Sequence, residues 1–340
     1  MAEHQRALLE VRDLRVSFFT PAGQVRAVNG ISYTVERGGV MGIVGESGSG
    51  KSVEAYSVLG LLPPTGRVVG GSITFEGRNV LAMSEAERTG FRGNDVAMIF
   101  QNPMTSLNPV YTVGYQLVEA LRAHDRTVKR EEANARAVEM LELVGINNPQ
   151  KRMKQYPHQL SGGQRQRVMI AMALICKPKL LIADEPTTAL DVTIQAQILD
   201  LMKEIQQKTG MGILFITHNL GVVAEICDKV SVMYAGRIVE QGGVEDIFYR
   251  PGHPYTLGLL RSMPRVDVGT RERLIPIPGT PVDMLDPPPG CPFASRCESC
   301  MQVCLEKMPP DMELGEGHRA ACWLRVRERL QERREGAYHE

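Results

Sequence analysis

The stretch of the chain best suited to bind phosphate is the octet Gly45-Glu46-Ser47-Gly48-Ser49-Gly50-Lys51-Ser52. It has the pattern G-x-x-x-x-G-K-[ST] of a phosphate-binding loop, in which glycines let successive backbone N–H groups turn toward phosphate oxygens. Lys51 would reach the outer phosphates of a nucleotide, and Ser52 would hold Mg²⁺. Residues 40–44 predict a strand before the octet, and residues 53–59 predict a helix after it. This context favours a nucleotide site over a Gly/Ser-rich turn that contains a lysine by chance.

Two adjacent carboxylates, Asp184 and Glu185, follow another apolar run at residues 180–183. At the end of a parallel strand, Asp184 can support a Mg²⁺ ion, and Glu185 can orient or deprotonate a water molecule. Hydrolysis of a nucleotide requires both a divalent ion and a positioned water. The plainer alternative is an acidic turn before Pro186, which the presence of the octet disfavours.

A second anion-binding segment is Leu160-Ser161-Gly162-Gly163-Gln164. Ser161 can cap a helix, the glycines leave room at the helix start, and Arg165 and Arg167 follow. An N-cap followed by a buried helix is the plainer alternative. Two such devices far apart in the sequence suggest that this segment serves the nucleotide of another subunit.

The elements that must position these residues follow an α/β pattern. Alternating or apolar runs predict strands, and 3.6-residue spacing predicts helices. The predicted strands are residues 8–19, 27–35, 40–44, 72–77, 96–100, 180–183, 212–216, 230–234 and 236–240, and the predicted helices are residues 53–59, 168–176, 194–207 and 323–334. Strand, helix and strand within residues 180–216 imply a parallel sheet with a crossover helix. Helical spacing from residue 113 to 156 indicates a helical insertion.

Composition fits a soluble globular protein of about two domains, with 340 residues, 43% apolar and 23% charged. Lysine plus arginine equals aspartate plus glutamate at 39 each, so no basic excess indicates nucleic acid or an anionic membrane as a partner. The longest apolar run, residues 168–176, is about half as long as a membrane span. The polar start lacks a signal core, so we expect the chain to stay in the cytoplasm.

Five of the seven cysteines, namely Cys291, Cys297, Cys300, Cys304 and Cys322, are crowded near the end of the sequence. In the reducing cytoplasm such crowding predicts a metal site rather than structural disulfides.

Taken together, these motifs resemble the ATPase subunits of ATP-binding cassette (ABC) transporters. The resemblance covers about residues 8–250 and adds Gln101, Thr188-Ala189-Leu190-Asp191 and Thr217-His218 to the segments above. It implies an α/β cassette with a phosphate loop, a β-rich N-terminal part and an inserted helical part. It also implies that two cassettes pair head to tail, each ATP lying between the octet of one and Leu160 to Gln164 of the other.

The resemblance further implies a role for each matching residue. Phe18, or Phe19 in its place, would stack on adenine, and the octet and Asp184 would complete the ATP site. Glu185 would be the general base, and His218, otherwise a plain loop histidine, would contact the γ-phosphate region. Ser52, Gln101 and Asp184 would serve Mg²⁺, Gln101 would also sense the membrane partner, and Asp191 would lie at the dimer seam.

Three further segments are similar to the dipeptide and oligopeptide importer branch. They are Gln101-Asn102-Pro103-Met104-Thr105-Ser106-Leu107-Asn108-Pro109, Gly252-His253-Pro254-Tyr255-Thr256, and the ending Gly290-Cys291-Pro292-Phe293 with Arg296-Cys297. We therefore expect a cassette at residues 1–250, with the helical part at about 102–160. A smaller, separately built C-terminal region would follow at 251–340. Gly39 departs from the branch, which usually has glutamate there, and we interpret it as a tolerated change in a turn.

The same resemblance implies a [4Fe-4S] cluster on Cys291, Cys297, Cys304 and Cys322, because four thiolates is the number such a cluster needs. Zinc would satisfy the same number, and the spacings match neither common ferredoxins nor zinc ribbons. Unligated thiols are the remaining alternative, and Cys300 is a fifth candidate ligand.

The function implied is that of an ATPase subunit that powers import of di- or oligopeptides from the cytoplasmic face of the cell membrane. Its expected partners are a second, paralogous ATPase subunit, two transmembrane permeases and, through the complex, an extracytoplasmic solute-binding protein. Nickel or another small solute is the alternative cargo. A soluble ABC ATPase acting on nucleic acid or ribosomes is less favoured, because no second cassette, coiled coil or basic arm is visible. A small-molecule kinase would have no use for Leu160 to Gln164 or for the pair Asp184 and Glu185.

Overall fold

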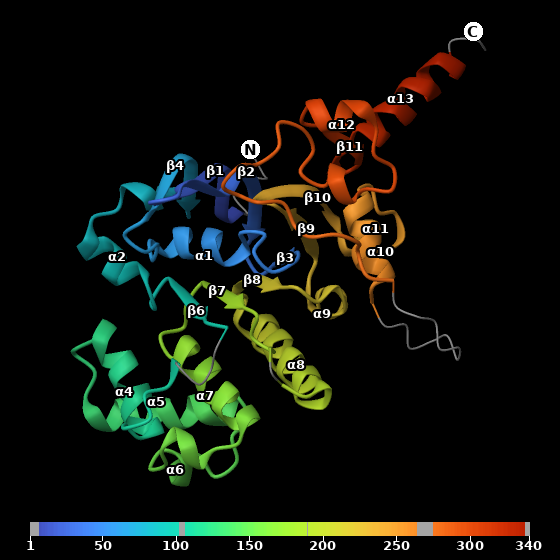
Figure 1. Cartoon of the computed structure of the whole chain (residues 1–340). Helices are drawn as coiled ribbons and strands as arrows, with labels where there is room; N and C mark the ends of the chain where they lie inside the picture. Colours follow the sequence, from blue (N-terminus) through green and yellow to red (C-terminus); the bar gives the residue numbers. More distant parts are fainter. Residues whose placement is uncertain (1–6, 102–105, 189, 264–274, 337–340) are drawn as a thin grey trace. The chain divides into compact units, whose positions relative to one another are not determined.

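The computed structural model describes residues 7–101, 106–188, 190–263 and 275–336, with side chains as far as residue 331. Figure 1 labels the helices and strands along the chain. Asn102 to Thr105 and Ala189, which belong to motifs of the predicted family, lie outside the described residues.

The chain divides into two compact units, each built from separate stretches of sequence. The first unit contains Met1–Leu9, Thr34–Val40 and Thr74–Ile216, and the second contains Glu10–Tyr33, Met41–Ile73 and Thr217–Glu340. The strands β1 (Ala7–Thr20), β2 (Gly23–Glu36) and β4 (Gly66–Phe75) contribute residues to both.

A parallel sheet lies at the centre of the first unit. Its strands are β6 (Val96–Ile99), β7 (Leu180–Asp184) and β8 (Gly212–Thr217). β7 pairs in parallel with β6 on one side and with β8 on the other, and every residue of β7 and β8 is buried. The helix α8 (Val192–Thr209) connects β7 to β8, which confirms the predicted crossover. Burial on both faces explains why these strands are uninterrupted apolar runs.

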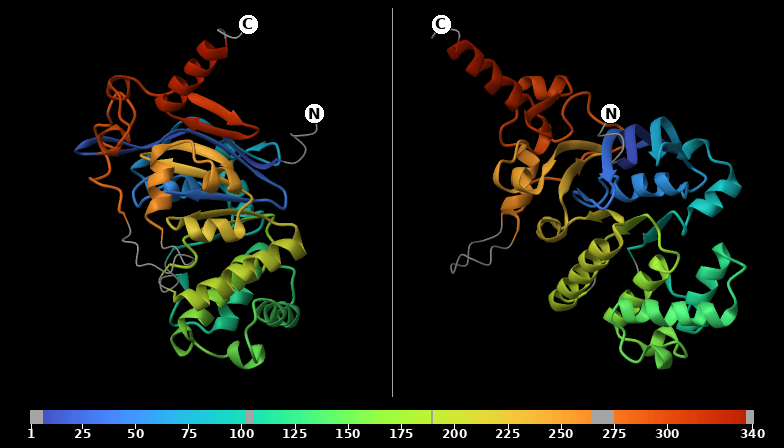
Figure 2. Two further views of the ribbon diagram at one scale, coloured as in Figure 1. Left: turned by 90° about the vertical axis from the view of Figure 1, so that its right-hand side faces the viewer. Right: turned by 180° about the vertical axis from the view of Figure 1, so that it is seen from behind.

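Helices make up most of the rest of the first unit, and four of them contact one another. They belong to the green part of the chain in Figure 2. These four are α4 (Val113–His124), α5 (Arg130–Leu143), α6 (Pro149–Arg152) and α7 (Gly162–Leu174). The shorter elements of the unit are β5 (Arg78–Asn79), η1 (Val80–Ala82), α2 (Glu85–Phe91) and η2 (Pro157–Gln159). The predicted helical insertion is confirmed, because α4, α5 and α6 follow one another between β6 and β7.

The second unit contains the octet and a mixed sheet. β3 (Val40–Val44) pairs in parallel with β9 (Lys229–Tyr234), and β9 pairs antiparallel with β10 (Arg237–Gly243) as the predicted hairpin. The helices beside them are α1 (Lys51–Leu59), α9 (Leu220–Ile226), α10 (Val244–Tyr249) and α11 (Pro254–Arg261). In the other sheet β1 lies between β2 and β4. A strand, the octet and a helix therefore follow one another as the phosphate-loop pattern requires.

The C-terminal region, residues 251–340, shares its sheet with the strands that precede it. β12 (His318–Ala321) pairs antiparallel with β10 and with β11 (Asp311–Gly315). The separately built C-terminal region stays a prediction. The remaining elements of the region are η3 (Ala294–Arg296), α12 (Gln302–Glu306) and α13 (Trp323–Gly336). The predicted boundary near residue 250 stays a prediction.

Two other differences from the predicted elements are small. The first helix begins at Lys51 rather than at residue 53, and the strand expected at residues 72–77 is the end of the longer β4. In the described part of the chain, no helix has both the length and the apolar character that crossing a membrane demands.

Candidate functional site

The octet forms a tight turn between β3 and α1 in the second unit. A Cβ atom on Gly45 would lie 2.1 Å from the carbonyl oxygen of Met233. Gly50, at φ 99°, is the N-cap of α1, and a Cβ atom there would lie 2.3 Å from the carbonyl oxygen of Ala27. Only glycine fits at these two positions, since the backbone approaches too closely for any side chain. The loop spacing seen in the sequence is therefore a packing requirement.

Lys51 is held against the loop that precedes it. Its side chain is buried, and Nζ donates to the carbonyl oxygens of Gly45 at 2.7 Å and Glu46 at 2.9 Å. Ser52 follows on the first turn of α1. The helix is attached to β2 by a buried hydrogen bond from the Tyr33 hydroxyl to Glu54. An ammonium group and a helix start are thus presented at one loop, which is the arrangement that binds phosphate.

The two candidate adenine-stacking residues have different surroundings in β1. Phe18 is half-buried, and its ring packs against Gly66, where an added Cβ atom would lie 2.8 Å from the ring. Phe19 is 46% exposed, and the guanidinium of Arg67 lies 5.7 Å from its ring centroid. Neighbouring strand residues face opposite sides, so the two rings cannot serve the same surface. His218, in the same unit, is exposed just after β8.

In the first unit, the structure brings two predicted catalytic residues together. Gln101, just after β6, donates from Nε2 to Glu185 Oε2 at 2.9 Å, and Thr188 Oγ1 donates to the same oxygen at 2.9 Å. Glu185 has φ 47°, and its N–H donates to the carbonyl oxygen of Ile216 at 2.8 Å. Asp184, at the end of β7, is 1% exposed. The buried carboxylate of Asp184 is therefore followed, at the end of β7, by the half-buried carboxylate of Glu185, which two hydrogen bonds hold in place.

The segment Leu160 to Gln164 forms the start of α7. Ser161 and Gln164 make a capping box, in which the Gln164 N–H donates to Ser161 Oγ at 3.3 Å and the Ser161 N–H donates to Gln164 Oε1 at 3.1 Å. Leu160 is buried, whereas Ser161 and Gly162 are exposed. The capped helix start is therefore open to solvent, as an anion-binding helix terminus must be.

Asp191, the predicted seam residue, lies near this segment. It is the N-cap of α8 and accepts from the Ile194 N–H at 2.9 Å. The side chain of Ile194 packs against Gly163, since a Cβ atom there would lie 3.0 Å from Ile194 Cγ2. Two helix starts that the sequence separates are thus neighbours in the first unit.

Four of the five C-terminal cysteines line one small cavity of the second unit. They are Cys291, Cys297, Cys304 and Cys322, as predicted for the metal site, whereas Cys300 is exposed and is not among the lining residues. The cavity measures about 10 Å³, which is the room of about one water molecule. Among the described residues, however, no three or more potential ligands are arranged to hold a metal ion.

Burial makes three of these thiols resist ionisation. It raises the pKa of Cys291 to about 12 and that of Cys297 to about 11, and the neighbouring thiols add to both shifts. The pKa of Cys322 is also raised by burial. Without a cation, Cys291, Cys297 and Cys322 would stay protonated at neutral pH, and a metal would have to displace their protons.

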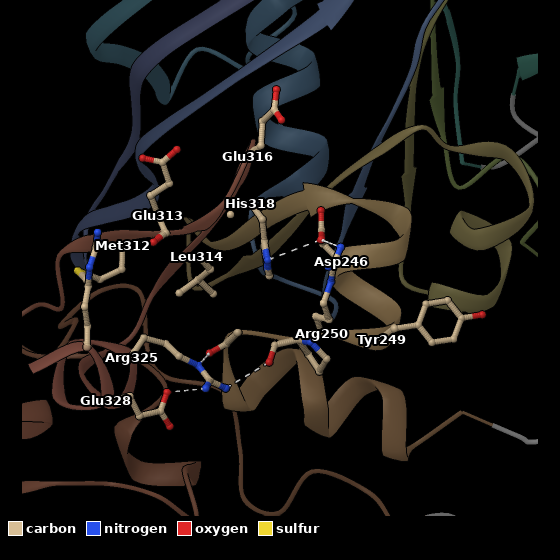
Figure 3. A pocket seen from close by; sticks show the side chains of 14 residues that line it. Asp246, Tyr249, Arg250, Met312, Glu313, Leu314, Glu316, His318, Arg325 and Glu328 are labelled. Carbon is tan, nitrogen blue, oxygen red and sulfur yellow. Dashed lines mark hydrogen bonds and ion pairs between the residues drawn. The ribbon is translucent and has the colours of Figure 1, made fainter. Parts of the chain in front are cut away.

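A pocket of about 890 Å³ in the second unit lies between α10, β11, β12 and α13. In Figure 3, His318 points toward Asp246, and Arg325 is joined to Glu328. None of its lining residues belongs to the octet. Acidic and basic side chains line this pocket together, so it is not a phosphate-binding site of the kind formed by the octet.

The sequence analysis missed two residues that contact the octet. Arg296 pairs with the carboxylate of Glu46, and the Tyr255 hydroxyl accepts from the Glu46 N–H at 2.8 Å. Both residues stand in segments that had been singled out, Tyr255 in Gly252 to Thr256 and Arg296 beside Cys297. Neither segment carries a signal for a contact with residues about 200 positions or more away.

Comparison with known families gives two matches along the chain. Residues 28–188 match the ABC transporter family, and residues 239–304 match the family described as oligopeptide/dipeptide transporter, C-terminal region.

Curated relatives are similar over nearly the whole chain. The dipeptide transport ATP-binding protein DppD of Bacillus subtilis is 55% identical over 318 residues, covering 93% of this chain and 94% of that protein. The oligopeptide transport ATP-binding protein OppD of Salmonella typhimurium is 53% identical over 323 residues, covering 95% of each.

Solved structures share the fold. The ATP-binding cassette MJ0796, as a dimer bound to ADP and phosphate after hydrolysis, gives a TM-score of 0.63 at 24% identity, covering 69% of this chain and 98% of that one. The protein cbiO1 of Clostridium perfringens, part of the transporter complex cbiONQ, gives 0.62 at 30% identity, covering 75% and 95%.

Proposed function

The chain belongs to the ATP-binding subunits of ABC transporters, in the dipeptide and oligopeptide branch, and from this premise we propose that it powers uptake of di- or oligopeptides. It is an α/β ABC ATPase cassette. The observation that carries the peptide assignment is the identity of 52–55% with peptide-transport subunits over at least 93% of the chain. A nickel or other small-solute importer is the alternative cargo class.

Each motif residue has a proposed part in ATP hydrolysis. The octet would bind the phosphates through its backbone N–H groups and Lys51, and Phe18 or Phe19 would stack on adenine. Ser52, Asp184 and Gln101 supply oxygen atoms of the kind Mg²⁺ prefers, and the ion would neutralise phosphate charge. Glu185 would take the proton of the attacking water, with His218 near the γ-phosphate. The hydrogen bond from Gln101 supports this role, because it fixes the direction of the Glu185 carboxylate.

The segment Leu160 to Gln164 would act on the ATP of a second cassette. Its exposed, capped helix start supports this assignment, since the free N–H groups of such a start bind anions. Asp191 would lie at the seam between the cassettes. Closure of the two cassettes onto each other would then depend on contacts that form only when ATP bridges both cassettes.

The proposed partners are a paralogous ATPase subunit, two transmembrane permeases and an extracytoplasmic binding protein. The chain would be held at the cytoplasmic face of the membrane by those permeases. Exposed aromatic side chains of the first unit, Tyr111 and Tyr115, stack with centroids 4.6 Å apart beside the segment that ends at Pro109, and they support a docking role for this surface.

For the C-terminal cysteines we propose a [4Fe-4S] cluster, with zinc as the alternative. The convergence of Cys291, Cys297, Cys304 and Cys322 on one cavity supports a shared ligand in both cases. The room of the cavity suits a single zinc ion, whereas the resemblance to the importer branch favours the cluster. A bound cluster or ion would supply the positive charge that keeps four thiolates together, three of them buried.

Reconstitution in proteoliposomes tests the proposed function. The chain would be combined with the proposed paralogue, permeases and binding protein, and phosphate release would be followed. We expect di- or oligopeptides carried by the binding protein to stimulate ATP turnover. The peptides should accumulate on the side of the vesicle membrane that faces the ATPase subunits. Stimulation by nickel and not by peptides would replace the peptide assignment with the alternative cargo.

A further inference from the structure

A buried arginine of the C-terminal region holds the side chain of an octet residue. Arg296 Nη1 donates to Glu46 Oε2 at 2.6 Å, and Nη2 donates to Glu46 Oε1 at 2.9 Å. The side chain of Arg296 is 3% exposed, and that of Glu46 is 28% exposed. A bidentate pair of this kind fixes the direction of both groups as well as their distance.

Other contacts within the second unit leave the guanidinium one orientation. Its Nε donates to the carbonyl oxygen of Pro278 at 2.9 Å, and Nη1 also donates to the Tyr234 hydroxyl at 3.3 Å. The rings of Tyr234 and Phe293 lie 5.7 and 5.9 Å from its central carbon. The guanidinium of Arg296 is therefore buried and held in one orientation, unlike the charge of a mobile surface side chain.

Glu46 is held at its backbone as well. Its N–H donates to the Tyr255 hydroxyl at 2.8 Å, and its carbonyl oxygen accepts from Lys51 Nζ at 2.9 Å. The same ammonium is held by the carbonyl oxygen of Gly45 at 2.7 Å. The first half of the octet and the lysine that would bind the phosphates thus share one network with two residues of the C-terminal region.

The element that carries Arg296 also leads into the cysteine cavity. Arg296 ends η3, and Cys297 follows it directly. Phe293 lines the cavity, and its ring centroid lies 5.3 Å from those of Tyr234 and Tyr255. Packing at the cavity is therefore continuous with the contacts that hold Glu46.

We propose that Arg296 is a positioning residue for the phosphate loop, through which the C-terminal region sets nucleotide affinity. The inference rests on the proposed function, since a loop that bound no phosphate would have no affinity to set. The coupling is reciprocal. If the contact between Arg296 and Glu46 favours the loop conformation that binds nucleotide, then bound nucleotide must in turn stabilise that contact.

Nucleotide titrations on the full chain test the position of the loop. We expect Arg296→Gln to raise the Kd of a fluorescent ATP analogue with Mg²⁺ about tenfold, within the usual range of coupling between sites. Arg296→Lys should lie between this variant and the parent, because lysine keeps the charge but not the bidentate geometry. Glu46→Gln should weaken nucleotide binding in the same way. The Kd of the double variant should not exceed that of the single variant with the higher Kd, because both changes remove the same pair.

The matched control is Arg261→Gln. Arg261 is an arginine of the same region whose pair with Glu298, at 3.4 Å, is exposed and does not contact the octet. Its removal should leave the Kd unchanged.

Hydrogen exchange separates positioning from a general structural role. ADP should slow exchange of the backbone amides of residues 291–304 in the parent, and this nucleotide-dependent protection should vanish in Arg296→Gln. A residue that only stabilised the region would lower protection equally with and without ADP, and that result would overturn the proposal.

Two further outcomes decide the matter. Parental Kd values in both Arg296→Gln and Glu46→Gln would overturn the proposal, while a parent that bound no ATP would contradict the proposed function instead. If Arg296→Gln does not fold, Glu46→Gln and the exchange experiment on the parent suffice, because an absence of ADP-dependent protection at residues 291–304 refutes the coupling.

Discussion

Gln101 and Glu185 lie 84 positions apart in the sequence and are joined by a hydrogen bond of 2.9 Å from the amide nitrogen to a carboxylate oxygen. Thr188 donates to the same oxygen from the loop that follows β7. Because β6 and β7 run in parallel and end side by side, the residues that follow them can meet. The carboxylate proposed as general base is thereby oriented by two neutral donors.

Glu185→Gln should abolish turnover while ATP still binds. The amide keeps the shape of the carboxylate but cannot accept the proton of the attacking water, and loss of a general base typically costs about a hundredfold or more in rate. Phosphate release and ATP titration of the assembled complex measure the two effects. Glu204→Gln, on the exposed face of α8, is the control and should behave as the parent. Parental turnover in Glu185→Gln would show that another group takes the proton.

Ser161→Asp should block the shared site while the fold is kept. Aspartate caps helices as well as serine does, so α7 should remain stable, but the added negative charge would repel the phosphates of the second cassette. ATP-dependent pairing of the cassettes and the rate of hydrolysis should both fall about tenfold or more. Ser84→Asp, the same change at the N-cap of α2, should leave both unaffected. Normal pairing and turnover in Ser161→Asp would argue against a shared site.

Cys304→Ser should prevent binding of the proposed cluster or zinc ion, and Cys300→Ser should not. Cys304 lines the cavity with three other cysteines, whereas Cys300 is exposed and outside the lining. After purification without oxygen, the parent and Cys300→Ser should show visible absorption with iron and acid-labile sulfide in equal amounts. Zinc with no colour would select the alternative, and a parent free of both metals would leave the thiols unligated.

The motifs could be found from the sequence because each is a short run whose chemistry depends on near neighbours. The fit of Gly45 and Gly50 against distant carbonyl groups could not be foreseen in detail, yet their spacing already indicated the loop. The pairing of β12 with β10 was missed, since β11 and β12 are short and carry weak alternation. The contact of Arg296 with Glu46 joins residues 250 positions apart in the sequence, and no local pattern encodes it.

His253→Asn should reduce the loss of stability that acid causes in the second unit. Burial lowers the pKa of His253 from the ordinary 6.5 to about 4, and Nδ1 accepts from the Tyr255 N–H at 3.0 Å, which requires that nitrogen to be unprotonated. Between pH 4 and 6.5 the unfolded state binds more protons than the folded state, so stability rises with pH by up to about 1.4 kcal/mol per unit and levels off above 6.5. Asparagine can cap α11 in the same way but does not titrate in this range. Urea unfolding midpoints measured from pH 4.5 to 7.5 should therefore depend less on pH in His253→Asn than in the parent or in His158→Asn, a change at an exposed histidine. An unchanged slope would mean that His253 is not the group that titrates.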